Sequence, residues 1–206
     1  MTPKEKPILF SGPMVRAILA GRKTMTRRLV RWPKWCDPST AEEDGDRFVA
    51  ICKSTGCFSE IPPPYAVGDV LWVRETWADT RGTHFDKPIY YKADVMPGSD
   101  ADTARINAGV KWKPSIHLPR WASRLTLRVV EVRKPERVQD IGKDGRKAKD
   151  VLAEGISERA IAREREWFHP DDSPAIAFKR VWDHVNSDGA WDRNDWVWPI
   201  RFEVLP

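Results

Sequence analysis

No apolar run in this chain is longer than a few residues, and this feature constrains the fold more than any other in the sequence. A helix that crosses a membrane needs about 20 consecutive apolar residues, so we expect no such helix and no membrane partner. Hydrophobic residues make up 41% and charged residues 32% of the chain, a balance typical of folded globular proteins. Residues 1–6 lack the apolar segment of a secretion signal, and we therefore expect a cytoplasmic protein.

Short strands separated by helices dominate the predicted secondary structure. Alternating, β-branched or aromatic residues predict strands at residues 8–10, 24–30, 70–75, 89–91, 125–132 and 196–204. Amphipathic stretches predict helices at residues 14–19, 147–155, 158–168 and 175–185. Pro13 suits the first turn of the first helix, and Gly21 suits its end. The pattern predicts an α+β fold with a small, barrel-like mixed sheet and flanking helices.

The length of the chain favours one domain with long insertions. A domain averages about 150 residues, and this chain has 206. Residues 32–66 are rich in Pro, Asp, Glu and Cys, and residues 93–120 are rich in loop signals. We therefore expect a single domain over residues 1–206, with irregular, loop-rich insertions at about 32–66 and 93–120.

Charge is distributed unevenly along the chain. The 35 Lys and Arg residues exceed the 30 Asp and Glu residues only modestly. Basic residues gather in residues 22–35 and 105–134, whereas acidic residues gather in residues 37–46 and 183–195. Such segregation is expected where one face of a protein meets phosphates, and it favours a nucleotide, RNA or DNA as the partner.

Three cysteines, Cys36, Cys52 and Cys57, are an odd number for a disulfide framework, and we expect free thiols. They could supply three zinc ligands, but no histidine lies within residues 1–83 to complete the set, so we expect no metal. We interpret most of the 11 tryptophans as packing residues. Trp72 and Trp77 could instead wall a base pocket by stacking, although core packing is the simpler interpretation.

Common catalytic and nucleotide-binding motifs are absent from the sequence, but two segments resemble a known family. There is no G-x-G-x-x-G, P-loop, H-E-x-x-H or G-x-S-x-G sequence. Residues 18–28 (ILAGRKTMTRR) and 67–73 (VGDVLWV) closely resemble the ASCH-domain family. Residues 113–124 (KPSIHLPRWASR) are similar to its larger phage and prophage branch. The resemblance covers about residues 7–31, 66–77 and 121–204 and leaves out both insertions.

This resemblance implies a PUA-like β-barrel fold and an association with RNA and modified nucleosides. Some ASCH proteins are small amidohydrolases that remove the acetyl group of N4-acetylcytidine with a lysine, a threonine and a later glutamate, and without a cofactor. On the G-x-K-T-x-T match these residues are Lys23 and Thr26, and Glu154 aligns with the glutamate. Other members bind or cleave RNA, so family membership alone leaves the activity open.

Amide hydrolysis needs a nucleophile, a base and stabilisation of the oxyanion. Under this hypothesis Lys23 is the base, Thr26 the nucleophile and Glu154 the proton shuttle to the leaving cytosine amine. Nearby basic residues and burial would both disfavour a charged lysine at position 23. The substrate-binding candidates on the same turn are Arg22, Thr24 and Arg28, of which Arg28 would hold a phosphate or the oxyanion. The plain alternative is a solvated turn lysine, ordinary strand threonines and a helix-end glutamate.

Further substrate-binding candidates are Trp72, Glu75, His117, Arg120 and Arg124. Glu75 could face the same cavity as Lys23, or it could simply pair with Arg74 or another surface arginine. His117 could act as a general acid in a ribonuclease, but a lone loop histidine is more often structural.

The rival to an amidohydrolase is a non-catalytic module that binds RNA or DNA. In that module, phosphates would be held by Arg22, Arg27, Arg28, Arg120 and Arg124. A ribonuclease is the third option. The sequence does not indicate an oligomeric state.

Overall fold

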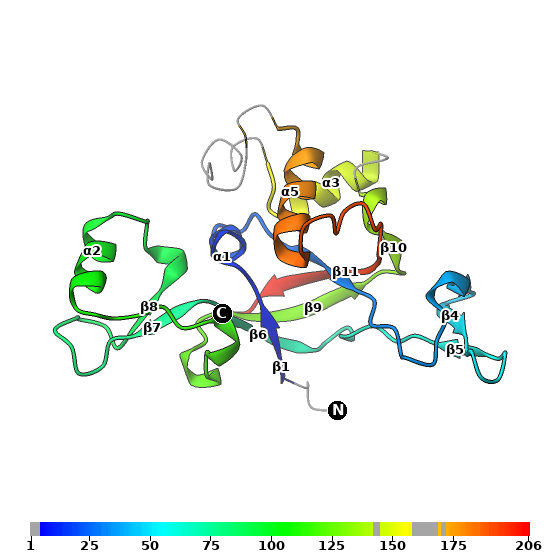
Figure 1. Ribbon diagram of the computed structural model, residues 1–206, viewed down its shortest axis with the longest axis horizontal. Coiled ribbons are helices and arrows are strands. Elements are labelled where there is room, and N and C mark those ends of the chain that lie inside the picture. The colour runs from blue at the N-terminus through cyan, green and yellow to red at the C-terminus, as the bar shows by residue number, and fades with distance from the viewer. Residues whose placement is uncertain (1–4, 142–144, 158–168, 170–171) are drawn as a thin grey trace. The chain divides into compact units, whose positions relative to one another are not determined.

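The structure, a computed structural model, describes residues 5–141, 145–157, 169 and 172–206. The described residues combine a mixed sheet with a few helices (Figure 1), which confirms the predicted α+β class. Strands pair in the order β1-β6-β9-β11-β10, and β2 also pairs with β11. Their bounds are Glu5–Leu9 (β1), Met25–Leu29 (β2), Val70–Arg74 (β6), Thr126–Val132 (β9), Glu136–Arg137 (β10) and Trp196–Val204 (β11). The sheet is mixed, because β1 and β6 are parallel whereas β6 and β9 are antiparallel.

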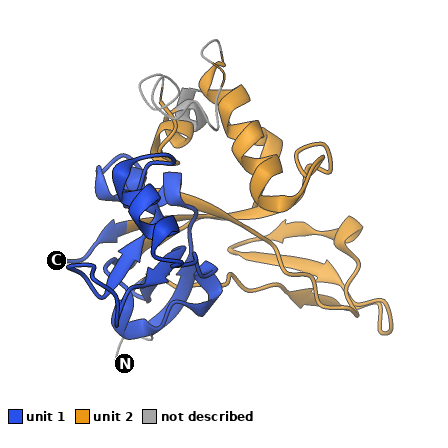
Figure 2. Ribbon diagram, turned by 60° about the vertical axis from the view of Figure 1, so that its left-hand side comes forward, with its two compact units in different colours: residues 1–23, 68–128, 203–206 blue, residues 24–67, 129–202 orange. Residues whose placement is uncertain are grey.

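The chain divides into two compact units (Figure 2). Unit 1 consists of Met1–Lys23, Gly68–Arg128 and Glu203–Pro206, and unit 2 consists of Thr24–Val67 and Val129–Phe202. No helix in the described part of the chain is long and apolar enough to cross a membrane.

In unit 1 the first helix ends in a motif that positions the basic turn. Helix α1 spans Gly12–Leu19, with Pro13 in its first turn, and Gly21 follows in the left-handed region at φ 67°. The amide of Gly21 donates to the carbonyl of Ile18, and the amide of Arg22 donates to that of Ala17. This is the Schellman arrangement, in which glycine avoids the cost of a left-handed backbone. The predicted helix and its C-terminal glycine are therefore confirmed.

The second insertion, which lies in unit 1, contains more structure than the predicted loops. It includes the helix α2 (Asp100–Asn107) and the short 3-10 turns η3 (Ser115–His117) and η4 (Arg120–Ala122). Next to it, β7 (Trp77–Asp79) pairs with β8 (Ile89–Tyr91). Trp77 is 5% exposed and packs with Ile89, Leu118 and Ala122. Trp77 is thus a core residue, as the packing interpretation predicted.

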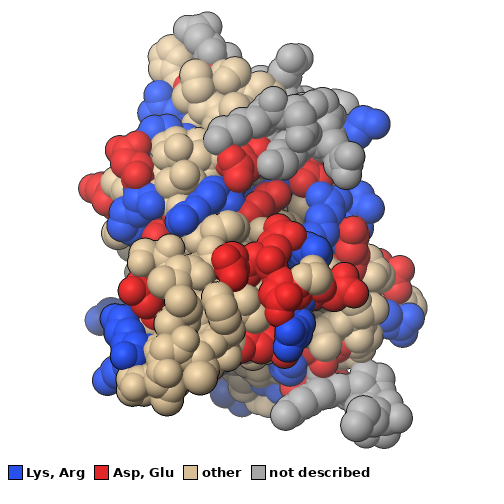
Figure 3. Space-filling view, turned by 90° about the vertical axis from the view of Figure 1, so that its right-hand side faces the viewer, with Lys and Arg blue, Asp and Glu red and all other residues tan. Residues whose placement is uncertain are grey.

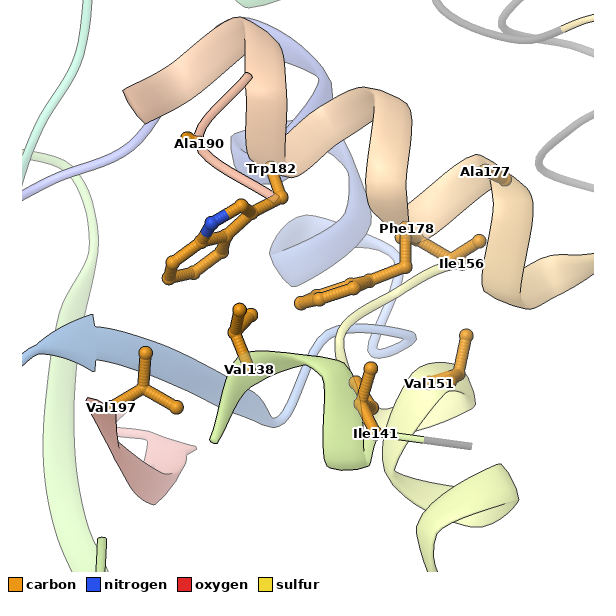
Figure 4. Close-up of a cluster of buried hydrophobic side chains, with 9 residues drawn as sticks. All are labelled: Val138, Ile141, Val151, Ile156, Ala177, Phe178, Trp182, Ala190 and Val197. Atoms are coloured by element: carbon orange, nitrogen blue, oxygen red, sulfur yellow. The ribbon is translucent and has the colours of Figure 1, made fainter. Parts of the chain in front are cut away.

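The core of unit 2 lies between helix α5 and residues near β10 and β11. Helix α5 spans Pro174–Asn186, and α3 spans Gly145–Ala153, close to two of the predicted helices. Figure 4 shows Phe178 and Trp182 projecting from α5 toward Val138 and Val197, all of them buried. The helix predicted at residues 158–168 lies outside the described residues.

The first insertion, in unit 2, contains a three-stranded antiparallel sheet, so the prediction of an irregular segment was wrong. Its strands are β3 (Glu42–Asp44), β4 (Arg47–Ile51) and β5 (Phe58–Glu60), preceded by the 3-10 turn η1 (Pro38–Thr40). Gly45, at φ 58°, allows the two-residue turn between β3 and β4, and the apolar run 48–50 in β4 is buried. Strand β3 is acidic at all three positions and exposed throughout. Figure 3 shows one face of the molecule, on which acidic side chains gather near the centre.

Candidate functional site

Lys23, the predicted base, is one of the most deeply buried side chains in unit 1. It follows the Schellman turn, and its amide donates to the carbonyl of Ala17 at 3.0 Å. The residue is only 1% exposed, and its Nζ atom lies 5.7 Å from the centre of the Phe10 ring. A solvated turn lysine is therefore excluded. Lysine is rarely buried to this degree, which makes the position a candidate for chemistry.

Thr26, the predicted nucleophile, lies in β2 of unit 2, where it pairs with Ile200 of β11 and is 4% exposed. Thr24 anchors the start of this strand on both sides. Its amide donates to the carbonyl of Ala153 at 2.8 Å, and its carbonyl accepts from the amide of Phe202 at 2.9 Å. The motif strand is thereby held against the end of α3.

Glu154, the predicted proton shuttle, follows α3 directly and is 8% exposed. Its Oε1 accepts a hydrogen bond from Nη1 of Arg27 at 3.1 Å. Side chains alternate between the faces of a strand, so Arg27 points to the face of β2 opposite to Thr26. Within unit 2 the structure therefore brings Glu154 to the motif strand, but to the face that carries Arg27 rather than to the face that carries Thr26.

Arg27 is the centre of a buried ion network that the sequence analysis did not identify. Its Nε donates to Glu136 at 2.8 Å and its Nη2 to Asp150 at 3.0 Å. Arg133 also donates to Asp150, at 2.7 Å. Burial alone would lower the pKa of Arg27, but the carboxylates of Glu154, Glu136 and Asp150 outweigh it and raise that pKa. In the sequence, the i, i+4 spacing of Asp150 and Glu154 could have indicated that both carboxylates lie on the same side of a helix.

The other basic residues of the turn are only partly buried. Arg28 pairs with Trp198 of β11 through the backbone, and burial lowers the pKa of its guanidinium. Arg22 is half-buried and donates its amide to Ala17 at 2.8 Å.

Glu75 lies in unit 1 and is 1% exposed. Its carboxylate accepts two hydrogen bonds from Arg124, at 2.9 and 3.0 Å. Arg124 also binds Asp94, at 2.6 and 2.9 Å, and lies 4.1 Å from the centre of the Tyr91 ring. Burial raises the pKa of Glu75, although Arg124 opposes the shift. Pairing with an arginine was one of the two predicted roles, and the partner is Arg124 rather than Arg74.

The remaining candidates lie at the surface of unit 1. His117 is exposed at the end of η3. Arg120 donates two hydrogen bonds to Glu5, at 2.9 and 3.1 Å. Trp72 is half-buried in β6, with the guanidinium carbons of Arg74 and Arg120 lying 5.1 and 6.0 Å from its ring centre. Both guanidinium groups thus lie over the ring of Trp72.

No group of three or more His, Cys, Asp or Glu side chains within the described ranges is arranged to hold a metal ion. Comparison of the chain with protein-family models, curated proteins and solved structures finds no match.

Proposed function

We propose that this protein recognises a nucleoside or nucleotide in the manner of the ASCH proteins that its motifs resemble, and that it hydrolyses the amide of an N4-acylated cytosine. The observation that carries the proposal is burial. Lys23, Thr26 and Glu154 are 1%, 4% and 8% exposed. Polar side chains are rarely so buried without a specific role. The mixed sheet supports the PUA-like fold that belongs to the same proposal.

The proposed reaction begins with proton transfer from the Thr26 hydroxyl to Nζ of Lys23. The proposal requires Lys23 in its neutral form, because only the neutral amine can take up a proton. Oγ1 of Thr26 then attacks the acyl carbonyl, and the bond to the exocyclic amine breaks as that nitrogen takes up the proton held by Nζ of Lys23. Water hydrolyses the resulting acyl ester of Thr26 and restores its hydroxyl.

The ion pairs of the arginines favour a small substrate over the rival nucleic-acid module. Arg27 binds three carboxylates, Arg124 binds two, and Arg120 binds one. An arginine that already binds carboxylates has less net attraction for phosphate. Arg28 remains the proposed ligand of a phosphate or of the oxyanion.

The test is the turnover of N4-acetylcytidine to cytidine by the wild-type protein and by Lys23→Ala, in the presence of EDTA. We expect Lys23→Ala to lower kcat/KM by about a hundredfold or more, because it removes the proposed base. Lys111→Ala, at an exposed position of unit 1, is the matched control and should retain full activity. Circular dichroism would verify that both variants are folded.

The dependence on salt concentration distinguishes the proposed hydrolase from a protein that binds nucleic acid through phosphates. Nucleoside turnover should change little between about 50 and 200 mM salt, whereas binding through several phosphates weakens steeply over that range. Absence of turnover on the acetylated nucleoside, nucleotide and RNA would contradict the amidohydrolase. Cleavage of RNA by the wild-type protein would favour the ribonuclease instead.

A further inference from the structure

The three cysteines of the chain lie in one row across neighbouring backbone segments of unit 2. Cys52 follows β4 and forms an antiparallel bridge with Cys36. On its other side, the amide of Cys52 donates to the carbonyl of Cys57 at 2.8 Å, which continues the register of β4 and β5. Residues directly opposite in antiparallel segments carry their side chains on the same face.

The backbone hydrogen bonds show which neighbour of Cys52 is better placed for a disulfide. Asp37 donates to the carbonyl of Ile51 at 3.0 Å, and Lys53 donates to that of Trp35 at 2.8 Å. These bonds flank Cys36 and Cys52, which makes the two cysteines a non-hydrogen-bonded pair. Such pairs have Cα atoms about 4.5 Å apart and closely approaching side chains, within the range of about 4.4–6.8 Å for disulfides. Cys57 is a hydrogen-bonded neighbour, whose side chain is farther away.

Cys36 and Cys52 also differ in exposure and acidity, as a reactive and a resolving thiol should. Cys36 is 2% exposed, whereas Cys52 is partly exposed with its Sγ 3.2 Å from the Ser54 hydroxyl. Hydrogen bonds from Ser54 and Thr55 lower the pKa of the Cys52 thiol to about 6. Burial raises the pKa of Cys36. An oxidant therefore meets a thiolate at Cys52, while Cys36 is shielded from it.

We propose that Cys52 is an oxidation site that forms a reversible disulfide with Cys36 after reaction with a hydroperoxide. The thiolate of Cys52 attacks the peroxide oxygen, the O–O bond breaks, and Cys52 becomes a sulfenic acid as hydroxide or alkoxide leaves. The sulfur of Cys36 then attacks that of Cys52, and the hydroxyl group leaves as water with the thiol proton. Two thiols lose two electrons, and the peroxide gains them. The disulfide would tie the segment before β3 to the end of β4, independently of the proposed hydrolase activity.

The experiment is peroxide treatment of the intact protein followed by peptide mapping. Trypsin separates the three cysteines, because it cleaves after Lys34, Arg47 and Lys53. We expect one-to-one hydrogen peroxide to remove two thiols and to join peptide 35–47 to peptide 48–53. A thiol reductant should reverse the link. This measurement needs no variant and so does not depend on how a substitution affects folding.

Variants test the assigned roles. Cys57→Ser is the matched control and should form the same disulfide at the wild-type rate. Cys52→Ser should consume peroxide about tenfold more slowly, because it removes the thiol that reacts with the peroxide. A link between peptides 48–53 and 54–74, a dimer joined by a disulfide, or overoxidation of Cys52 without a link would each overturn the proposal.

Discussion

Lys23 lies in an environment that its residue type does not lead one to expect. It carries a basic amine yet lies against Phe10 and is almost fully buried. The local backbone explains the placement, because the Schellman turn at Gly21 brings the chain back over the end of α1. A residue held in this way can keep one orientation, which a catalytic base needs.

Thr26 offers the most direct test of the proposed nucleophile. Thr26→Val removes the hydroxyl and keeps the shape, so we expect kcat/KM on N4-acetylcytidine to fall by at least about a hundredfold. Thr26→Ser keeps a hydroxyl and should retain activity within about tenfold of the wild type. The readout is cytidine release, with thermal unfolding measured in parallel. Equal activity of the two variants would contradict the nucleophile assignment.

At the scale of elements, the Arg27 network joins three parts of unit 2. Arg27 lies in β2, Glu136 in β10, and Asp150 and Glu154 lie in and just after α3. A buried ion pair pays a desolvation cost, but removal of one partner leaves the others uncompensated. The network therefore links these elements, and its loss should lower the free energy of unfolding.

Arg27→Met should lower the free energy of unfolding by about 3–5 kcal/mol, because it leaves buried carboxylates without their partner. The matched control is Arg47→Met, at an exposed pair with Asp44 in which the side chains are 60% and 54% exposed. That change should cost less than about 1 kcal/mol. Urea unfolding measures both. Equal effects of the two substitutions would show that the network contributes little to stability.

At the scale of the whole molecule, a set of paired carboxylates predicts sensitivity to acid. In each of these carboxylates, a side-chain hydrogen bond holds the pKa below its ordinary value. The carboxylates are Glu5, Asp37, Asp79, Asp86 and Asp102. A depressed pKa in the folded state contributes stability above the ordinary pKa of the group, and this contribution is lost as the pH falls. Glu75 has the opposite effect on the pH dependence of stability, because burial raises its pKa.

We therefore expect the urea midpoint to fall as the pH is lowered from about 5 to about 3. Asp79→Asn should weaken this dependence, because it removes the partner of Arg81. Asp46→Asn, in the exposed turn after β3, is the matched control. A midpoint that is constant over this range would contradict the prediction.

Local signals determined much of the secondary structure. Helix α1 is bounded by Pro13 and Gly21, and the predicted strands at residues 89–91 and 196–204 have the observed limits. The three strands of the first insertion were not predicted, because the high content of Pro, Asp, Glu and Cys was given more weight than the short apolar run of β4. Proline, charge and cysteine content describe a segment on average, whereas a two-residue turn at Gly45 is enough to pair two strands.

The sequence by itself determined the motif residues, the α+β class and the ends of α1, because these depend on neighbours along the chain. Only the tertiary structure decided the burial of Lys23, the binding of Arg27 to Glu136 and Glu154, and the alignment of the three cysteines. These features join residues far apart in the chain, or depend on strand register. A shift of one residue turns every side chain to the other face, and register is set by the packing of the whole sheet.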